Sequence, residues 1–149
     1  MKLQILGSGT STGVPEIGCN CAVCTSNDAR DKRLRTSALL HTDNEHILID
    51  CGPDFREQML RLDTFHKLDA VLLTHEHYDH VGGIDDLRPF CKFGEIPVVA
   101  DNYAATHLKE RMPYCFGENL YPGVPRIYLQ VATPGDAFKI GETTILPIQ

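Results

Sequence analysis

The chain has 149 residues, enough for one ordinary domain, with a formal net charge of −6 and 42% hydrophobic residues. This balance is typical of a folded protein and excludes a disordered chain. The acidic charge argues against binding to nucleic acid or anionic membranes, and no stretch approaches the roughly 20 apolar residues that a membrane span needs. Because no secretory signal is visible either, we expect a cytoplasmic protein.

The first half of the chain predicts strands around a long loop. Residues 2–6 predict a first strand, and residues 14–35 lack periodicity and predict a functional loop. Residues 37–41 and 46–50 are strand-like and are separated by turn residues, so they predict a hairpin. Apolar residues at helical spacing then predict a helix over 54–65.

The second half continues the alternation of strands and helices. Residues 68–74 form a short apolar run that predicts a buried strand. The remaining predicted helices cover 84–93 and 102–111, although Pro89 argues against a regular helix in the first of these. The remaining predicted strands cover 96–100, 126–131 and 143–148. This order predicts an α/β (or α+β) fold, a mixed sheet with helices on the outside, in a single domain.

The last predicted strand runs up to the final residue with no helix after it. A strand that ends a sheet in this way is an exposed edge, which folded proteins usually cover. We therefore expect that residues 1–149 are truncated at the C-terminus. The uncovered apolar face should make the chain a homo-oligomer or poorly soluble.

A group of metal-binding side chains follows the strand over 68–74. The donors are His75, His77, Asp79 and His80. Imidazole nitrogen and carboxylate oxygen suit zinc and similar metals. In an extended loop His75 and His77 project to the same side, whereas Asp79 and His80 come one turn later and can bind a second ion. Two ions about 3.5–4 Å apart can share a water and clamp both oxygens of a phosphoryl displacement, so we predict a dinuclear zinc or manganese site.

These residues resemble a known family. The pattern His75-x-His77-x-Asp79-His80 resembles the H-x-H-x-D-H signature of the metallo-β-lactamase superfamily, and residues 47–52 resemble its strand-plus-Asp motif. The resemblance implies an αββα sandwich with the metals at the edge between two sheets. It also implies that His75 and His77 bind one metal, that Asp79 and His80 bind the other, and that Asp50 supports the ligands from behind. The alternative for Asp50 is an ordinary turn residue.

Three cysteines form a second cluster inside the loop 14–35. Cys19, Cys21 and Cys24 have the spacing C-x-C-x-x-C, which can wrap one structural zinc. Such a zinc needs a fourth ligand from elsewhere, and the alternative is three reduced thiols in a loop. The other cysteines, Cys51, Cys91 and Cys115, are expected to be small buried residues, although Cys51 adjoins the histidine cluster.

The cysteine loop and its flanks narrow the resemblance. Residues 7–15, 18–24 and 33–37 are similar to the phosphodiesterase branch found in carbon–phosphorus lyase operons, which hydrolyses cyclic phosphodiesters of ribose-type substrates. The resemblance implies a histidine near the C-terminus as the fourth zinc ligand, and a further histidine for each catalytic metal with a bridging Asp. No histidine follows His107 in this sequence, and His107 itself is expected on a helix surface.

The expected function is that of a metal-dependent hydrolase, a phosphodiesterase in which a metal-bound hydroxide attacks a small-molecule phosphodiester. Asp79 is the expected catalytic residue, which orients the nucleophile or protonates the leaving oxygen. The basic residues between Arg30 and Arg35 could hold a substrate phosphate. Alternatives are lactone or thioester hydrolysis or RNA 3′ processing on the same scaffold, or a catalytically inactive metal-binding fragment, which the short count of ligands favours for these 149 residues.

Overall fold

A six-stranded mixed sheet organises the computed structural model, which describes residues 1–117 and 120–148. Its strands lie in sequence order: β1 (Lys2–Gly7), β2 (Ser37–His41), β3 (His46–Ile49), β4 (Ala70–Leu72), β5 (Ile96–Ala100) and β6 (Ile127–Val131). The pairs β1–β2 and β2–β3 are antiparallel, whereas β3 to β6 run parallel. The predicted mixed sheet is confirmed, and the carboxyl ends of its parallel strands share one edge.

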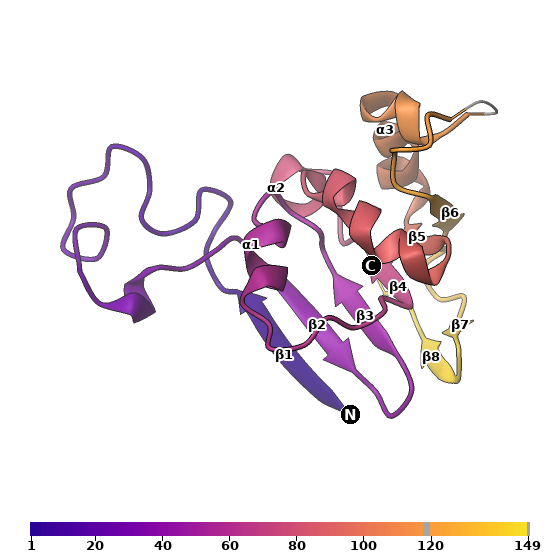
Figure 1. Cartoon of the computed structure of the whole chain (residues 1–149), viewed down its shortest axis with the longest axis horizontal. Coiled ribbons are helices and arrows are strands. Elements are labelled where there is room, and N and C mark those ends of the chain that lie inside the picture. The colour runs from indigo at the N-terminus through magenta and orange to yellow at the C-terminus, as the bar shows by residue number, and fades with distance from the viewer. Residues whose placement is uncertain (118–119, 149) are drawn as a thin grey trace.

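Helices cover one face of this sheet (Figure 1). They are α1 (Phe55–Leu60), α2 (Tyr78–Val81) and α3 (Asn102–Arg111), with the 3₁₀ segments η2 (Ile84–Phe93) and η3 (Pro113–Cys115). A further 3₁₀ turn, η1 (Ala29–Asp31), lies in the loop between β1 and β2, away from the sheet. Phe55, Leu87 and Leu108 pack with strand residues such as Leu48 in the main core. The start of α3 is fixed by Asp101, whose carboxylate accepts a hydrogen bond of 2.7 Å from the Ala104 amide. Within the described residues, no helix has the length and apolar character needed to cross a membrane.

Two predicted helices differ from the structure. The helix predicted over 54–65 ends at Leu60, because Asp63 and Thr64 favour turns over helix and the chain then crosses the sheet toward β4. The segment 84–93 forms 3₁₀ turns instead of an α-helix. Pro89 accounts for this difference, since its ring removes one amide donor and clashes with the preceding turn.

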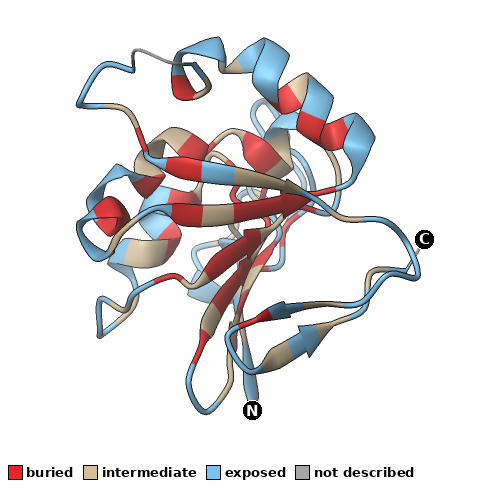
Figure 2. Ribbon diagram, turned by 90° about the vertical axis from the view of Figure 1, so that its right-hand side faces the viewer, coloured by how far each residue is buried: buried red, intermediate tan, exposed pale blue. Residues whose placement is uncertain are grey.

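A second, two-stranded sheet lies on the face opposite the helices (Figure 2). It consists of β7 (Phe138–Ile140) and β8 (Thr143–Ile145). The strand predicted over 143–148 is β8, which ends at Ile145 and pairs with β7, a strand too short for its pattern to be recognised. Ile140 of this hairpin packs on Ile47 and Ala70, which begins the expected second layer.

The buried carboxylate of Glu45 joins the two sheets. It accepts hydrogen bonds of 2.8 Å from the Glu142 amide and from the Thr143 hydroxyl, and another from Thr42 beside it. The bond from Thr42, followed by those from Glu142 and Thr143, lowers the pKa of Glu45. These bonds fix the β7–β8 hairpin against the β2–β3 turn.

The hairpin covers only part of its side of the sheet. Leu3 pairs with Leu40, which faces the hairpin, so Leu3 and Ile5 point to the same side. Their exposed fractions are 54% and 61%. Two neighbouring apolar side chains exposed on an edge strand favour association with another chain.

We predict that residues 1–149 self-associate through this part of β1. The double variant Leu3→Lys, Ile5→Lys should shift the chain toward monomer in light scattering, because lysine on an edge strand opposes pairing. Ile17→Lys is the matched control, since Ile17 is fully exposed (101%) on the remote cysteine loop. A wild-type chain that is already a clean monomer would contradict the prediction.

Candidate metal centre

Asp50 lies where β3 ends and organises the edge of the sheet. Its φ is +60°, in the left-handed region that Asp tolerates better than most residues. The residue is almost fully buried, with 2% exposed. The Asp50 amide donates to the Leu72 carbonyl on β4 at 2.9 Å, and its carbonyl accepts from the Ser37 hydroxyl at 2.8 Å. The backbone therefore holds this carboxylate in one place, pointing into the structure.

The turn after β3 is bonded directly to the turn after β4. The Cys51 amide donates to the His80 carbonyl at 2.8 Å, and the Gly83 amide donates to the Cys51 carbonyl at 2.8 Å. Gly52 makes this approach possible, because a Cβ there would overlap the Asp79 carbonyl oxygen. A Cβ at Gly83 would likewise overlap the Gly52 carbonyl oxygen. Both glycines are thus required by the close contact of two backbones.

The Asp50 carboxylate bonds to both ends of the histidine loop. It accepts from the Thr74 amide at 2.8 Å, from the Thr74 hydroxyl, and from His80 Nδ1 at 2.7 Å. Since Nδ1 of His80 donates to Asp50, the lone pair of this ring is on Nε2, the nitrogen left free to bind a metal. The prediction that Asp50 supports the ligands from behind is consistent with this geometry.

The four predicted donors lie in one short loop beside this network, where pairs of them are close to one another. His80 Nε2 lies 3.1 Å from Asp79 Oδ2. Two ligands of one tetrahedral zinc are separated by about 3.3 Å, so this pair fits one ion. The rings of His75 and His77 have centroids 4.7 Å apart, and two imidazoles on one ion are separated by about 5 Å. The centroid of the His75 ring also lies 3.9 Å from that of the His80 ring, so His75 neighbours both other histidines, and the division of the donors between two ions stays a prediction.

The cysteine cluster is more compact than the histidine cluster. Among the described residues, only Cys19, Cys21 and Cys24 place three donor atoms all within 4.8 Å of one another. The Cys24 amide donates to the sulfur of Cys21 at 3.5 Å, and the Glu16 amide donates to the sulfur of Cys24 at 3.4 Å. The bond from the Cys24 amide, with weaker ones from the neighbouring thiols, lowers the pKa of Cys21 to about 7. Thiolate, the form that binds zinc, is thereby favoured at Cys21.

Comparison with known proteins identifies the family of this chain. A profile of the "Beta-lactamase superfamily domain" matches residues 45–149, which include Asp50 and all four donors of the histidine cluster. The chain belongs to this superfamily. The match confirms the resemblance of the H-x-H-x-D-H pattern, and with it the metallo-β-lactamase type of fold and its hydrolase-like architecture.

The similarity to individual proteins extends beyond residues 45–149 and covers almost the whole chain. A crystal structure of a diphosphatase from the PhnP family is 39% identical, with a TM-score of 0.85, over 97% of this chain and 55% of that one. Zinc-bound PqqB from Methylobacterium extorquens has a TM-score of 0.82 at 23% identity, over 100% of this chain and 56% of that one, which shows the fold alone. An octanoyltransferase from Porphyromonas gingivalis is 50% identical over 150 residues, all of this chain but 30% of that protein.

The chain matches only part of each relative, and this limits what the name of each relative implies for the matched part. The chain spans about half the length of the two solved structures and under a third of the octanoyltransferase. Most of the octanoyltransferase lies outside the match, so the activity in its name is not assigned to the matched part. The diphosphatase, in contrast, is matched over 97% of this chain.

The cysteine loop of this superfamily member projects from the sheet (Figure 1) and is held at its base. Val14 and Arg33 exchange backbone hydrogen bonds of 2.9 and 2.8 Å across this base. The Arg35 guanidinium pairs with Asp54 at 2.8 Å and also donates to the Ser11 carbonyl. Arg35 therefore anchors the loop to the start of α1, and this engagement argues against the suggested role in binding a substrate phosphate.

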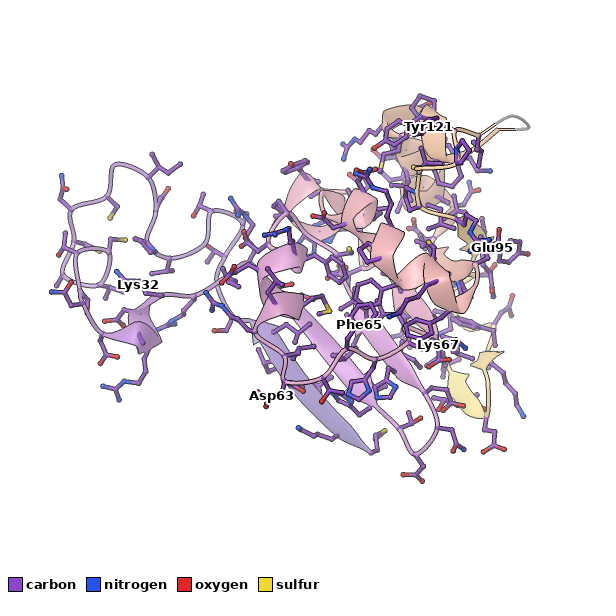
Figure 3. The ribbon with its side chains drawn as sticks, in the orientation of Figure 1. Lys32, Asp63, Phe65, Lys67, Glu95 and Tyr121 are labelled. Atoms are coloured by element: carbon purple, nitrogen blue, oxygen red, sulfur yellow. The ribbon has the colours of Figure 1, made fainter. Side chains whose placement is uncertain are left out.

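The rest of the basic run is also engaged within the loop. Arg30 pairs with Asp28 at 2.6 Å, and Lys32, labelled in Figure 3, donates to the Ser26 carbonyl at 2.6 Å. Arg33 donates to the Arg30 carbonyl. These contacts hold the loop together, and none reaches the histidine cluster.

Two residues near the site carried no sequence signal of their own. Thr74 bonds through one hydroxyl to Asp50 and lies 3.0 Å from His75 Nδ1, so it links the buried carboxylate to the first histidine. Arg111, at the end of α3, donates to the Glu76 carbonyl between His75 and His77.

Cys51 is fully buried, and this burial raises the pKa of its thiol. It is therefore a core residue, as the sequence predicts.

We predict that Cys21→Ser lowers the zinc content of the protein by one ion per chain when a fourth ligand is available, as in a longer chain. A serine hydroxyl is a far poorer zinc ligand than a thiolate, and a structural zinc site needs four donors. Elemental analysis after dialysis measures the difference. Cys115→Ala is the matched control, because burial raises the pKa of Cys115 to about 11 and leaves it a neutral thiol. Equal zinc in wild type and Cys21→Ser would refute the site.

Proposed function

We propose that this chain forms the metal-binding half of a metal-dependent phosphodiesterase. The observation that carries the proposal is the pairing of Asp79 with His80 at 3.1 Å, with His80 fixed from behind by Asp50 at 2.7 Å. A pair of oriented N and O donors beside a pair of imidazoles suits two divalent ions, either zinc or manganese. The 39% identity to a protein named a diphosphatase supports phosphorus–oxygen chemistry over lactone or thioester hydrolysis.

In this proposal each residue of the cluster has a defined role. His75 and His77 hold one ion, and Asp79 and His80 hold the other. When bound, the two ions would lower the pKa of a water and neutralise charge on the phosphate. Asp79 would also orient the nucleophile or protonate the leaving oxygen, while Asp50 and Thr74 keep the rings turned toward the ions. The substrate would be a small phosphodiester in the cytoplasm, where reduced thiols remain available for the zinc loop.

The number of donors limits what these residues can do alone. Within residues 1–117 and 120–148, the histidine loop offers two donors to each ion, and a catalytic zinc usually keeps about three protein ligands. We propose that both sites need further donors, including a fourth ligand for the cysteine zinc, and the chain spans only 55% of the diphosphatase. For the 149 residues by themselves, an inactive metal-binding chain is the alternative that this count favours.

We predict that residues 1–149 hydrolyse bis(p-nitrophenyl) phosphate little or not at all with added manganese or zinc, whereas a longer chain that supplies the further donors is active. In the active form, His77→Ala and Asp79→Ala should each lower turnover by about a hundredfold or more, because each removes a ligand from one ion. His107→Ala and Asp43→Ala are matched controls that should retain activity, since His107 bonds within α3 and the Asp43 side chain is 96% exposed.

Three outcomes would change this account. Robust turnover by the 149-residue chain, abolished by His77→Ala, would show that these residues complete the site unaided. An active longer chain whose turnover survives Asp79→Ala would remove that residue from the mechanism. Hydrolysis of a lactone or thioester in preference to the phosphodiester would move the protein to another reaction of the same fold.

A further inference from the structure

Three histidines outside the candidate metal centre come together at the opposite end of the sheet. His41 ends β2, His46 begins β3, and His66 lies in the segment between α1 and β4. The ring centroids are 5.0 Å apart for His41 and His46, 4.3 Å for His46 and His66, and 6.2 Å for His41 and His66. Because His46 and Asp50 flank β3 at its two ends, about 13 Å of strand separates this cluster from the candidate centre.

Strand pairing and backbone hydrogen bonds hold the segments that carry the three rings. His41 and His46 are direct partners in the antiparallel register of β2 and β3, where facing side chains have Cβ atoms about 5 Å apart. The segment that carries His66, marked in Figure 3 by Asp63, Phe65 and Lys67, crosses the sheet beside them. It is bonded to β3 by the Asp69 amide, which donates to the His46 carbonyl at 2.8 Å, and by the His46 amide, which donates to Asp69 at 2.9 Å.

The spacing of the rings is that of ligands around one ion. Imidazoles bound to one tetrahedral metal have ring centroids about 5 Å apart, and the three observed separations bracket this value. The nitrogen atoms are not all within 4.8 Å of one another as the rings now stand. His41 Nε2 lies 3.1 Å from Gln4 Oε1, and the His46 and His66 rings are stacked at 12°. Binding therefore requires the rings to turn and the partly buried hydrogen bond between His41 and Gln4 to be exchanged.

The surroundings favour the neutral imidazole that a metal needs. Partial burial, followed by the neighbouring charges of His46, Lys2 and His66, lowers the pKa of His41. Partial burial and His66 likewise lower the pKa of His46, although Asp69 opposes this. Neutral rings avoid the repulsion that three imidazolium groups would suffer, and they present lone pairs. The Asp69 carboxylate, which also pairs with Lys67 at 2.8 Å, supplies a nearby negative charge.

We propose that His41, His46 and His66 form a separate metal site for a late first-row divalent ion of the nickel, copper and zinc group. Three imidazoles without a carboxylate among the ligands suit these ions and not magnesium or calcium. The site would fasten the segment between α1 and β4 onto the β2–β3 hairpin. It is independent of the catalytic proposal, because it shares no residue with the histidine loop or the cysteine loop.

The test is a titration of metal-free protein with Ni²⁺, in which any binding by the histidine and cysteine loops is common to wild type and variants. Wild type should bind Ni²⁺ at least about tenfold more tightly than His66→Ala, because one of three ligands is lost. Isothermal titration calorimetry gives the affinity, and broadening of histidine ring signals in NMR by paramagnetic Ni²⁺ shows which rings are bound. His107→Ala is the matched control, since its ring is hydrogen-bonded within α3 to the Tyr103 carbonyl.

A second variant guards against an effect on folding. His41→Gln keeps a polar side chain of similar reach to Gln4 but removes the imidazole, and it should weaken Ni²⁺ binding as His66→Ala does. Ni²⁺ affinity that is equal in wild type, His66→Ala and His41→Gln would overturn the proposal and leave the cluster a packing feature. An equal loss in His107→Ala, or broadening confined to His75, His77 and His80, would overturn it as well.

Discussion

The structure of the candidate centre depends on one buried carboxylate. Asp50 sits in a left-handed turn directly after β3 and accepts hydrogen bonds from the Thr74 amide, the Thr74 hydroxyl and His80 Nδ1. A carboxylate with 2% exposure is costly to bury unless its oxygens are bonded, and these three donors meet that requirement. The same bonds fix both ends of the histidine loop. The hydrogen bonds that stabilise the buried Asp50 carboxylate therefore also position the loop that carries the metal donors.

This constraint acts through two adjacent parallel strands. Asp50 follows β3 and Thr74 follows β4, so both lie at the same edge of the sheet. The turns after these strands are joined by backbone hydrogen bonds between Cys51, His80 and Gly83. The donors therefore lie on a rigid edge, which is what a metal centre requires for preorganised ligands. The cysteine loop is organised differently, since it projects from the sheet, carries its own sulfur hydrogen bonds, and is tied to the body by the ion pair of Arg35 with Asp54.

Much of the fold and the site could be predicted from the sequence because the signals are local. The strand before His75, the spacing of His75 to His80 and the Asp at the end of β3 all lie within short windows. The short strand β7 was missed because three residues carry too little periodicity. The meeting of His41 and His46 with His66 was missed for a different reason. It depends on the register of two strands and on the path of a segment 20 residues further on, which no local pattern reveals.

The central claim is that Asp50 orients the metal ligands without binding metal itself. Its most direct test is the zinc affinity of the histidine centre in wild type and in Asp50→Asn, measured by competition with a chromophoric chelator. The amide of this variant has only one oxygen that can accept from Thr74 and His80, so we expect an affinity lower by roughly 10–100-fold, with the zinc of the cysteine loop retained. Asp43→Asn, at an exposed turn, should leave both affinities unchanged. A histidine centre that binds zinc equally well in Asp50→Asn and wild type would contradict the account.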